Sequence, residues 1–256
     1  MNARRAGLVL TGVAGLVGGI LAEALRDTYE VAGIDRRRAA GVATRRVDLR
    51  RARGLERAFE GADVVVHLAA NPDAHASWPD VYDNNIRSTL NVFEAARGAG
   101  VRRLVFASSN HVTGMYERDE PYASICAGRY DGLEPAGIPK ITSDWPIRPD
   151  GPYGVGKALG EATGRYYADE FGMSVICLRI GTVSRSGRPG SDRHFATLLT
   201  HGDLVRLVRS SVSADAALRF GVYYGVSANT WNFWDLEASR RELGYIPEDN
   251  AEDCRD

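Results

Sequence analysis

The sequence contains almost no lysine and little cysteine. Only two of its 256 residues are lysines, Lys140 and Lys157, so nearly all of its 32 basic residues are arginines. Its three cysteines, Cys126, Cys177 and Cys254, are odd in number, far apart and without metal-ligand spacing. We therefore expect no bound metal, and a reducing cytoplasm is the simplest compartment for the chain.

Long apolar runs and an excess of one charge are also missing. No apolar run reaches the roughly 20 residues that span a bilayer, and residues 1–5 lead into a strand pattern without the features of a secretion signal. The net charge of −1 argues against a broad nucleic-acid surface. We therefore expect no membrane and no nucleic-acid partner. The length fits one large α/β domain with a small appended lobe.

One of the two lysines lies in the sequence Gly-Pro-Tyr-Gly-Val-Gly-Lys, residues 151–157, at the start of a predicted helix. Tyr153 and Lys157 are four residues apart and therefore share one helix face. A free tyrosine has a pKa of about 10, and a fixed cation nearby favours the phenolate. Tyr153 is thus a candidate general acid/base. The alternative is a packed tyrosine beside a solvated lysine, so the motif needs a nucleotide site elsewhere in the chain.

A glycine-rich turn near the N-terminus predicts that nucleotide site. An apolar strand over residues 7–12 leads into Gly12, Gly15 and Gly18 and then into an amphipathic helix ending near residue 27. In this context the glycines allow a tight turn, a close approach of backbone to pyrophosphate, and close packing of helix on strand. The N–H groups at the helix start, at Leu16 and Val17, would face the phosphates.

The next two strands predict contacts to the rest of a dinucleotide. The strand over residues 29–35 ends in Asp35, about 20 residues after the loop, where a carboxylate binds the adenosine ribose and favours NAD over NADP. Arg36 follows at once and could hold a 2′-phosphate, so NADP stays open; a solvated charge run is the alternative. Asp48 and Leu49, at the end of a third predicted strand over 47–49, are placed at the adenine edge.

Two further segments complete the predicted cofactor site. A buried strand over residues 62–70 ends in Leu68, Ala69 and Ala70, and the two alanines are small enough for a cofactor to lie against them. His67 in this strand is interpreted as a core histidine. In the predicted helix 82–98, Asn85 is either an exposed amide or the support of a water or proton relay.

Candidate substrate contacts follow the strand over residues 103–109. Ser109, Asn110 and His111 stand at its carboxyl end, where ligands bind in open α/β sheets; turn formation is the alternative. Residues 115–150 show no sustained period, as in a functional or mobile segment. A helix over 153–171 and a strand over 174–180 follow.

The alternation of strands and helices predicts an α/β fold with a doubly wound parallel sheet, the Rossmann fold. We divide it into an NAD-binding domain over residues 1–180 and a small C-terminal substrate lobe over 181–256, interleaved as one compact unit. In this lobe we expect helices at 195–199, 203–212 and 236–243, and a strand at 220–226.

With the glycine loop, Asp35, Ser109 and the Tyr153/Lys157 pair in this order, the chain resembles the extended short-chain dehydrogenase/reductases, the NAD-dependent epimerase/dehydratase superfamily. It is most similar to the uronate dehydrogenases, which oxidise C1 of a cyclic hexuronic acid to a lactone, and to archaeal NAD-dependent glucose-6-phosphate dehydrogenases. The motifs that carry this closer similarity are Phe106–His111, Arg179–Gly181, Ala228–Asn229 and the segment 243–252.

The resemblance implies a role for each matching residue. Tyr153 would be the general base, Lys157 would lower its pKa and bind the nicotinamide ribose, and Ser109 would hold the reacting hydroxyl. Asn110, His111 and Thr182 would contact the sugar, Arg193 would bind a substrate carboxylate through its planar fork, and Ile180 would lie against the cofactor.

These residues predict an NAD-dependent oxidation of a sugar or sugar acid, preferably a hexuronate, at its anomeric hydroxyl. A neutral aldose or sugar phosphate is the alternative substrate. A nucleotide-sugar epimerase or dehydratase and a nucleotide-sensing regulator are the alternative functions. A homo-oligomer is expected by analogy with the superfamily.

Overall fold

Seven parallel strands form one sheet in the computed structural model, which describes residues 5–255, and their order is β3-β2-β1-β4-β5-β6-β7. The central strands β4 to β6 are buried along their whole length. They are therefore near-continuous apolar runs, as parallel strands covered on both faces should be. The strands are β1 (Gly7–Thr11), β2 (Glu30–Asp35), β3 (Ala43–Arg46), β4 (Val64–His67), β5 (Arg103–Ser109), β6 (Ser174–Ile180) and β7 (Phe220–Gly225).

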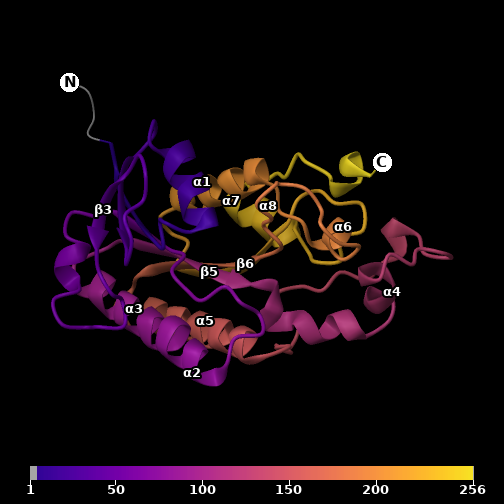
Figure 1. Ribbon diagram of the computed structural model, residues 1–256, viewed down its shortest axis with the longest axis horizontal. Helices are drawn as coiled ribbons and strands as arrows, with labels where there is room; N and C mark the ends of the chain where they lie inside the picture. The colour runs from indigo at the N-terminus through magenta and orange to yellow at the C-terminus, as the bar shows by residue number, and fades with distance from the viewer. Residues whose placement is uncertain (1–4, 256) are drawn as a thin grey trace.

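Helices cover both faces of the sheet (Figure 1). One layer consists of α1 (Leu16–Leu25), α7 (His201–Ser213) and α8 (Glu237–Leu243); the other consists of α2 (Trp78–Val81), α3 (Ser88–Gly98) and α5 (Pro152–Phe171). Each layer closes its own apolar core against the sheet. The doubly wound Rossmann fold expected from the sequence is therefore confirmed.

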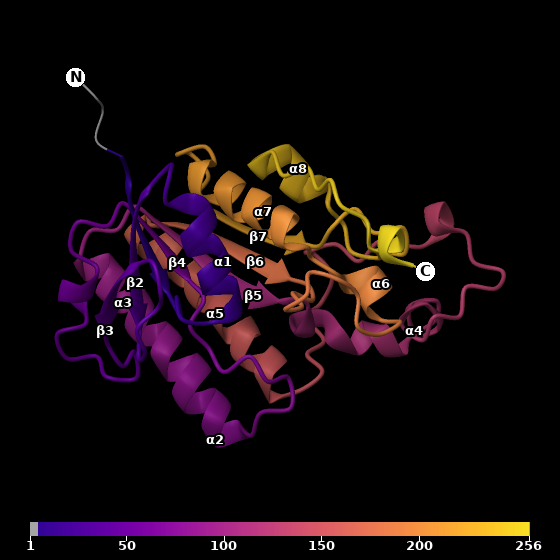
Figure 2. The same cartoon turned by 45° about the horizontal axis from the view of Figure 1, so that its top comes forward.

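The chain changes direction across the sheet between β1 and β4, which are neighbours although two strands separate them in sequence. At such a switch point the loops at the carboxyl ends of the strands diverge and leave a crevice for ligands. The short helices α4 (Tyr122–Cys126) and α6 (His194–Thr197) and the C-terminus all lie beyond this end of the sheet (Figure 2).

Several predicted elements have different limits in the structure. The third strand, expected to close at residues 47–49, ends earlier: β3 pairs with β2 as far as Arg46 opposite Asp35, the last residue of β2. Between β3 and β4 the chain forms one 3₁₀ turn, Glu56–Ala58. The helix expected over 82–98 begins at α2 and passes through a π-helical segment, Tyr82–Arg87, into α3.

The segment 115–150 packs against the C-terminal part of the chain and forms a third apolar core with it. This core includes Tyr116 and Ile141 from the segment and Phe233 and Trp234 from the C-terminal part. The segment contains three short helical turns. They are the end of the 3₁₀ stretch Asn110–Arg118, the helix α4, and the 3₁₀ turn Pro135–Gly137. The domain division at residue 180 stays a prediction, and the sheet runs across it because β7 belongs to the same sheet.

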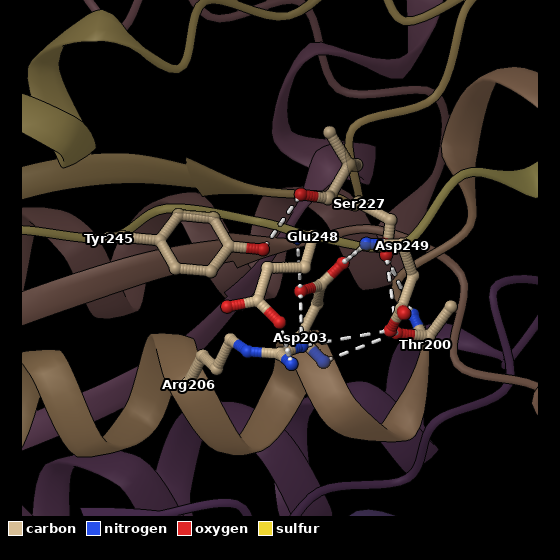
Figure 3. Close-up of polar contacts among 8 residues, drawn as sticks. Thr200, Asp203, Arg206, Ser227, Tyr245, Glu248 and Asp249 are labelled. Carbon is tan, nitrogen blue, oxygen red and sulfur yellow. Dashed lines mark hydrogen bonds and ion pairs between the residues drawn. The ribbon is translucent and has the colours of Figure 1, made fainter.

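A buried carboxylate fixes the C-terminal segment to α7 (Figure 3). Asp203, which is fully buried in the first turn of α7, accepts hydrogen bonds from the backbone N–H groups of Glu248 at 2.8 Å and Asp249 at 3.1 Å. Arg206 donates to the same side chain at 2.9 Å. The segment continues into the 3₁₀ turn Ala251–Cys254.

Asn229 connects this C-terminal segment to α6. Its Oδ1 accepts from the backbone N–H of Ala251 at 3.0 Å, and its Nδ2 donates to the carbonyls of Ala196 at 3.2 Å and Leu198 at 2.8 Å. The position of α6 therefore depends on the attachment of the C-terminal segment. Among residues 5–255, none of the helices combines the length and apolar character needed to cross a bilayer.

Candidate active site

A cavity of about 380 Å³ lies at the carboxyl ends of β5 and β6, beside the first turns of α5. Its lining contains every residue expected to contact a sugar, together with six of those expected to contact the cofactor. The two predicted groups of residues therefore meet in one space. The sugar group is Ser109, Asn110, His111, Tyr153, Thr182 and Arg193; the cofactor residues in the lining, besides Tyr153, are Val17, Leu68, Ala70, Lys157 and Ile180.

The glycine loop has the shape that a dinucleotide phosphate requires. Gly12 has a positive φ of 73°, and a Cβ there would lie 2.8 Å from the backbone of Ala69. A Cβ on Gly18 would lie 2.4 Å from the carbonyl oxygen of Gly12. Gly15 caps α1 without a side-chain hydrogen bond, and the first N–H groups of a helix have no partner within it. The loop therefore offers donors and a positive helix end to an anion.

Thr11 and His67 fix the two strand ends that flank this loop. The Thr11 hydroxyl oxygen accepts from the N–H groups of Leu68 at 3.1 Å and Ala69 at 3.2 Å, so its hydrogen is donated to His67 Nδ1 at 2.7 Å. The imidazole then carries its proton on Nε2 and donates to Thr89 at 3.0 Å. Burial lowers the pKa of His67 to about 3. The interpretation of His67 as a core histidine is confirmed.

Asp35 lies at the end of β2 beside the glycine loop. Its carboxylate accepts from the backbone N–H of Ala14 at 3.0 Å and of Arg37 at 2.9 Å. A cofactor hydroxyl bound at Asp35 would donate to a carboxylate that already accepts from these two backbone N–H groups. Arg36 is exposed, which agrees with the solvated charge run considered as an alternative for the arginines.

Asp48 and Leu49 lie in the turn that follows β3, not within a strand. Arg50 pairs with the Asp48 carboxylate at 2.7 Å, and this hydrogen bond lowers the pKa of Asp48 to about 2. Leu49 is buried, and its carbonyl accepts from the side chain of Asn91 at 2.9 Å. Their assignment to the adenine edge stays a prediction.

Asn85 lies in the π-helical segment and is buried, so an exposed amide is the wrong expectation. Its Oδ1 accepts from the backbone N–H of Asn71 at 2.7 Å, and its Nδ2 donates to the Asn71 carbonyl at 3.1 Å. Both ends of the amide are therefore used to hold the chain just after Ala70. A π-helical turn often marks a functional site because it redirects one side chain.

Tyr153 and Lys157 share one face of α5, as their spacing predicts. Lys157 Nζ donates to the carbonyl of Ala107 at 2.5 Å and lies 5.6 Å from the centre of the Tyr153 ring. Burial lowers the pKa of Lys157 to about 8. Burial also raises the pKa of Tyr153 to about 12, although the hydrogen bond with the Ser109 hydroxyl by itself lowers this pKa. The expected lowering of the Tyr153 pKa by Lys157 is thus wrong in the structure, because the ammonium is directed at Ala107 and the phenol is desolvated.

Two polar groups from β5 and its following turn face the Tyr153 side of the cavity. His111 Nδ1 lies 2.6 Å from the carboxylate of Asp150, and its ring meets that of Tyr153 edge-on at 5.6 Å. Sequence reasoning missed Asp150, although the acid stands directly before the Gly151 motif.

Asn110 is buried, and its Nδ2 is one of two buried side-chain nitrogens within residues 5–255 that have no hydrogen-bond partner. A sugar oxygen would satisfy this donor.

Arg193 is already engaged by a carboxylate. Its Nε and Nη2 donate to the two oxygens of Glu117 at 2.5 and 2.7 Å, and its Nη1 donates to the Thr182 hydroxyl at 3.3 Å. The Cys126 thiol donates to Glu117 at 3.6 Å. Sequence reasoning placed Arg193 and Thr182 correctly at the cavity but missed Glu117.

A second cavity, of about 430 Å³, lies at the opposite edge of the sheet, near the amino ends of β5 and β6. Four arginines line it: Arg97 and Arg102 pair with carboxylates, and Arg103 and Arg219 bond the ends of helices. Arg103 donates to the carbonyls of Ser211, Val212, Ala214 and Asp215 at the end of α7. Cations there offset the negative ends of helix dipoles. We therefore place the chemistry at the carboxyl edge.

Comparison with known proteins shows the family of the chain. The family model described as "NAD dependent epimerase/dehydratase family" matches residues 8–202, which is more than half of the chain. The chain belongs to this family. Membership makes NAD the cofactor.

Within the family, the chain is 40% identical to an L-arabinose 1-dehydrogenase (NAD(P)(+)) of Haloferax volcanii, over 95% of this chain and 97% of that protein. It is 33% identical to an NAD-dependent glucose-6-phosphate dehydrogenase of the same organism, over 95% and 94% of the two chains. The crystal structure of uronate dehydrogenase from Agrobacterium tumefaciens superposes with a TM-score of 0.81 at 32% identity, covering 98% of this chain and 87% of that one.

Proposed function

We propose that this enzyme oxidises the anomeric hydroxyl of a cyclic aldose to a lactone with NAD. The observation that carries the proposal is the position of Tyr153, which lines one cavity with both the cofactor residues and the sugar residues. Proteins to which the chain is similar are named as dehydrogenases of L-arabinose, glucose 6-phosphate and uronate. A sugar dehydrogenase is the function that these relatives share.

Three side chains would carry the proton chemistry. Tyr153 takes the proton of the anomeric hydroxyl, and Ser109 donates a hydrogen bond to the same oxygen as it becomes a carbonyl. Lys157 is fixed by Ala107 beneath the phenol and supplies a cation to the site. The oxidised nicotinamide, when bound, accepts the hydride from C1 and adds a positive charge that favours the phenolate.

The remaining predicted residues would position the two ligands. The N–H groups of the glycine loop and of the first turn of α1 hold the pyrophosphate. Asp35 binds the adenosine ribose and opposes a 2′-phosphate, so NAD should be used in preference to NADP; Arg36 is the residue through which NADP could still bind. Asn110, through its unpartnered Nδ2, and His111, held by Asp150, bind sugar hydroxyls.

Net NADH formation tests the reaction. The purified enzyme should produce NADH and a lactone when it is mixed with NAD and members of a panel of neutral aldoses, uronates and aldose phosphates. A nucleotide-sugar epimerase would interconvert its substrate without net NADH. A nucleotide-sensing regulator would bind NAD and convert none of the sugars.

A single substitution tests the assignment of the base. Tyr153→Phe removes the phenolic oxygen and keeps the ring, so turnover should fall by about 10²–10⁴-fold. NAD affinity, measured by calorimetry, should stay within about twofold because the glycine loop is unchanged. Retained turnover would overturn the role of Tyr153.

We also propose that the enzyme forms a homodimer through the layer of α2, α3 and α5. This layer exposes large apolar side chains: Trp78, Tyr82 and Tyr166 are each more than half exposed, and Val155 is 38% exposed. Exposed apolar patches of this kind are typical of protein interfaces. Light scattering should give twice the chain mass, and the double substitution of Tyr82 and Tyr166 by Asp should give the single mass.

A further inference from the structure

The guanidinium of Arg193 does not face the cavity as a free cation. Glu117 holds two of its donor positions in a two-point pair, at 2.5 and 2.7 Å, and Thr182 takes a third at 3.3 Å. This is the geometry in which arginine binds a carboxylate most strongly. The position expected to bind a substrate carboxylate is thus filled by a carboxylate of the protein itself.

Arg193 lines the cavity, and Glu117 holds it from outside the lining. Glu117 comes from the 3₁₀ stretch that follows β5, and Arg193 caps α6. Both side chains are largely shielded, with 13% of Glu117 and 26% of Arg193 exposed. Glu117 is further held by the thiol of Cys126 at 3.6 Å. A substrate carboxylate would have to displace a shielded, multiply bonded partner.

The other charged groups around the sugar end offer no substitute cation. Asp150 is an additional acid, paired with His111 at 2.6 Å. His194 accepts a backbone N–H through Nδ1, so that nitrogen carries no proton. Lys157 is directed at Ala107, beneath the Tyr153 phenol. An anionic sugar in the cavity would therefore meet an arginine whose charge Glu117 already neutralises.

We propose that Glu117 determines the charge of the substrate, so that the enzyme takes an uncharged aldose in preference to a uronate or an aldose phosphate. This inference rests on the proposed anomeric oxidation. Glu117 and Thr182 take three of the five N–H groups of Arg193, so a neutral sugar hydroxyl in the cavity can accept from one that is left. A carboxylate or phosphate at that place is repelled by Glu117.

Three sugars that share their ring configuration at C2 to C4 provide the test. L-Arabinose, D-galactose and D-galacturonate differ at C5, which carries hydrogen, a hydroxymethyl group or a carboxylate. The unaltered enzyme should use either neutral sugar with a kcat/KM at least about tenfold above that for the uronate. Tenfold corresponds to the free energy of about one charge-assisted hydrogen bond.

Glu117→Gln keeps the size of the side chain and releases the charge of Arg193. The ratio of kcat/KM for D-galactose to that for D-galacturonate should fall by about 10- to 100-fold, because the uronate gains a guanidinium whose charge is no longer paired. Glu134→Gln, in an exposed position of the same segment, is the matched control and should leave the ratio unchanged. Glu117→Asp retains the charge and should keep the preference for the neutral sugar.

Equilibrium binding separates this inference from the proposed reaction. Calorimetry on Tyr153→Phe with NAD should show tighter binding of D-galactose than of D-galacturonate, and the added Glu117→Gln substitution should reverse the order. Binding in this order without any NADH formation by the unaltered enzyme would defeat the proposed reaction alone. NADH formation with D-galacturonate favoured by the unaltered enzyme would overturn the role of Glu117, even if Glu117→Gln did not fold.

Discussion

Glu161 and Arg179 form a two-point ion pair between α5 and β6, with N–O distances of 3.0 and 2.9 Å and almost no exposure of either side chain. Ser108 donates to the same carboxylate at 2.6 Å. Because Glu161 lies one turn beyond Lys157 and two turns beyond Tyr153, the pair fixes the catalytic face of α5 to the sheet.

Removing one partner of this pair should destabilise the protein strongly. Arg179→Met leaves the Glu161 carboxylate buried and without its counter-charge, so the free energy of unfolding should fall by about 3–5 kcal/mol in a urea titration. The double variant with Glu161→Leu should be more stable than the single one, since no unpaired charge remains. As a control, breaking the exposed pair of Arg240 and Glu237 should cost less than about 1 kcal/mol. Equal costs for both pairs would contradict this account.

His67 should make the stability of the protein fall in acid. Its pKa is lowered by burial to about 3 from an ordinary value of 6.5, so the unfolded chain binds a proton between these two values and the folded chain does not. Stability is complete above about pH 6.5 and falls by about 1.4 kcal/mol for each pH unit below it, until about pH 3.

Urea titrations over this pH range measure that slope. His67→Gln removes the titrating group. It should therefore reduce the slope of unfolding free energy against pH by up to about 1.4 kcal/mol per pH unit, the contribution of one proton. His75→Gln, at an exposed histidine, should leave it as in the unaltered protein. An unchanged slope in His67→Gln would show that other groups cause the acid sensitivity.

The rate of sugar oxidation should rise with pH. The proposed base is the Tyr153 phenolate, and because burial raises the pKa of Tyr153 to about 12, its phenolate fraction increases about tenfold per pH unit in the neutral range. Reduction of the lactone needs the protonated phenol and should show the opposite trend.

The initial rates of a sugar with hydrogen and with deuterium at C1 should be compared at each pH. A full isotope effect shows that hydride transfer limits the measured rate. Tyr153→Phe should show a low rate that does not vary with pH. A rate of the unaltered enzyme that is independent of pH while the isotope effect is full would exclude Tyr153 as the base.

The parts of the site that the sequence predicted are those that depend on local pattern. Residues 103–109 and 174–180 were expected as strands because unbroken apolar runs of that length form buried parallel strands, and these are the limits of β5 and β6. The contact of Tyr153 and Lys157 with one cavity follows from their helical spacing. Gly12 and Gly18 stand where the turn leaves no room for a Cβ.

The parts that the sequence did not predict depend on contacts between distant residues. Glu117 meets Arg193 across 76 residues and Asp150 meets His111 across 39, and neither acid lies in a segment with a recognisable period. The pKa of Tyr153 was expected to move down because spacing shows the nearby lysine; burial, which no spacing shows, moves it up.

Asp203 should matter for both stability and sugar binding, although it lies outside the cavity. Asp203→Asn keeps the size of the side chain but presents an NH₂ group to one of the donors of Glu248, Asp249 or Arg206, so unfolding free energy should fall by about 2–3 kcal/mol. The released C-terminal segment would loosen α6 and the guanidinium of Arg193. KM for the sugar should therefore rise while KM for NAD is unchanged, because the hydrogen bonds of Asp203 go to Arg206, Glu248 and Asp249 and not to the glycine loop. Asp131→Asn, at an exposed acid, should change neither quantity by more than the experimental error. A loss of stability with both KM values unchanged would show that Asp203 supports the fold alone.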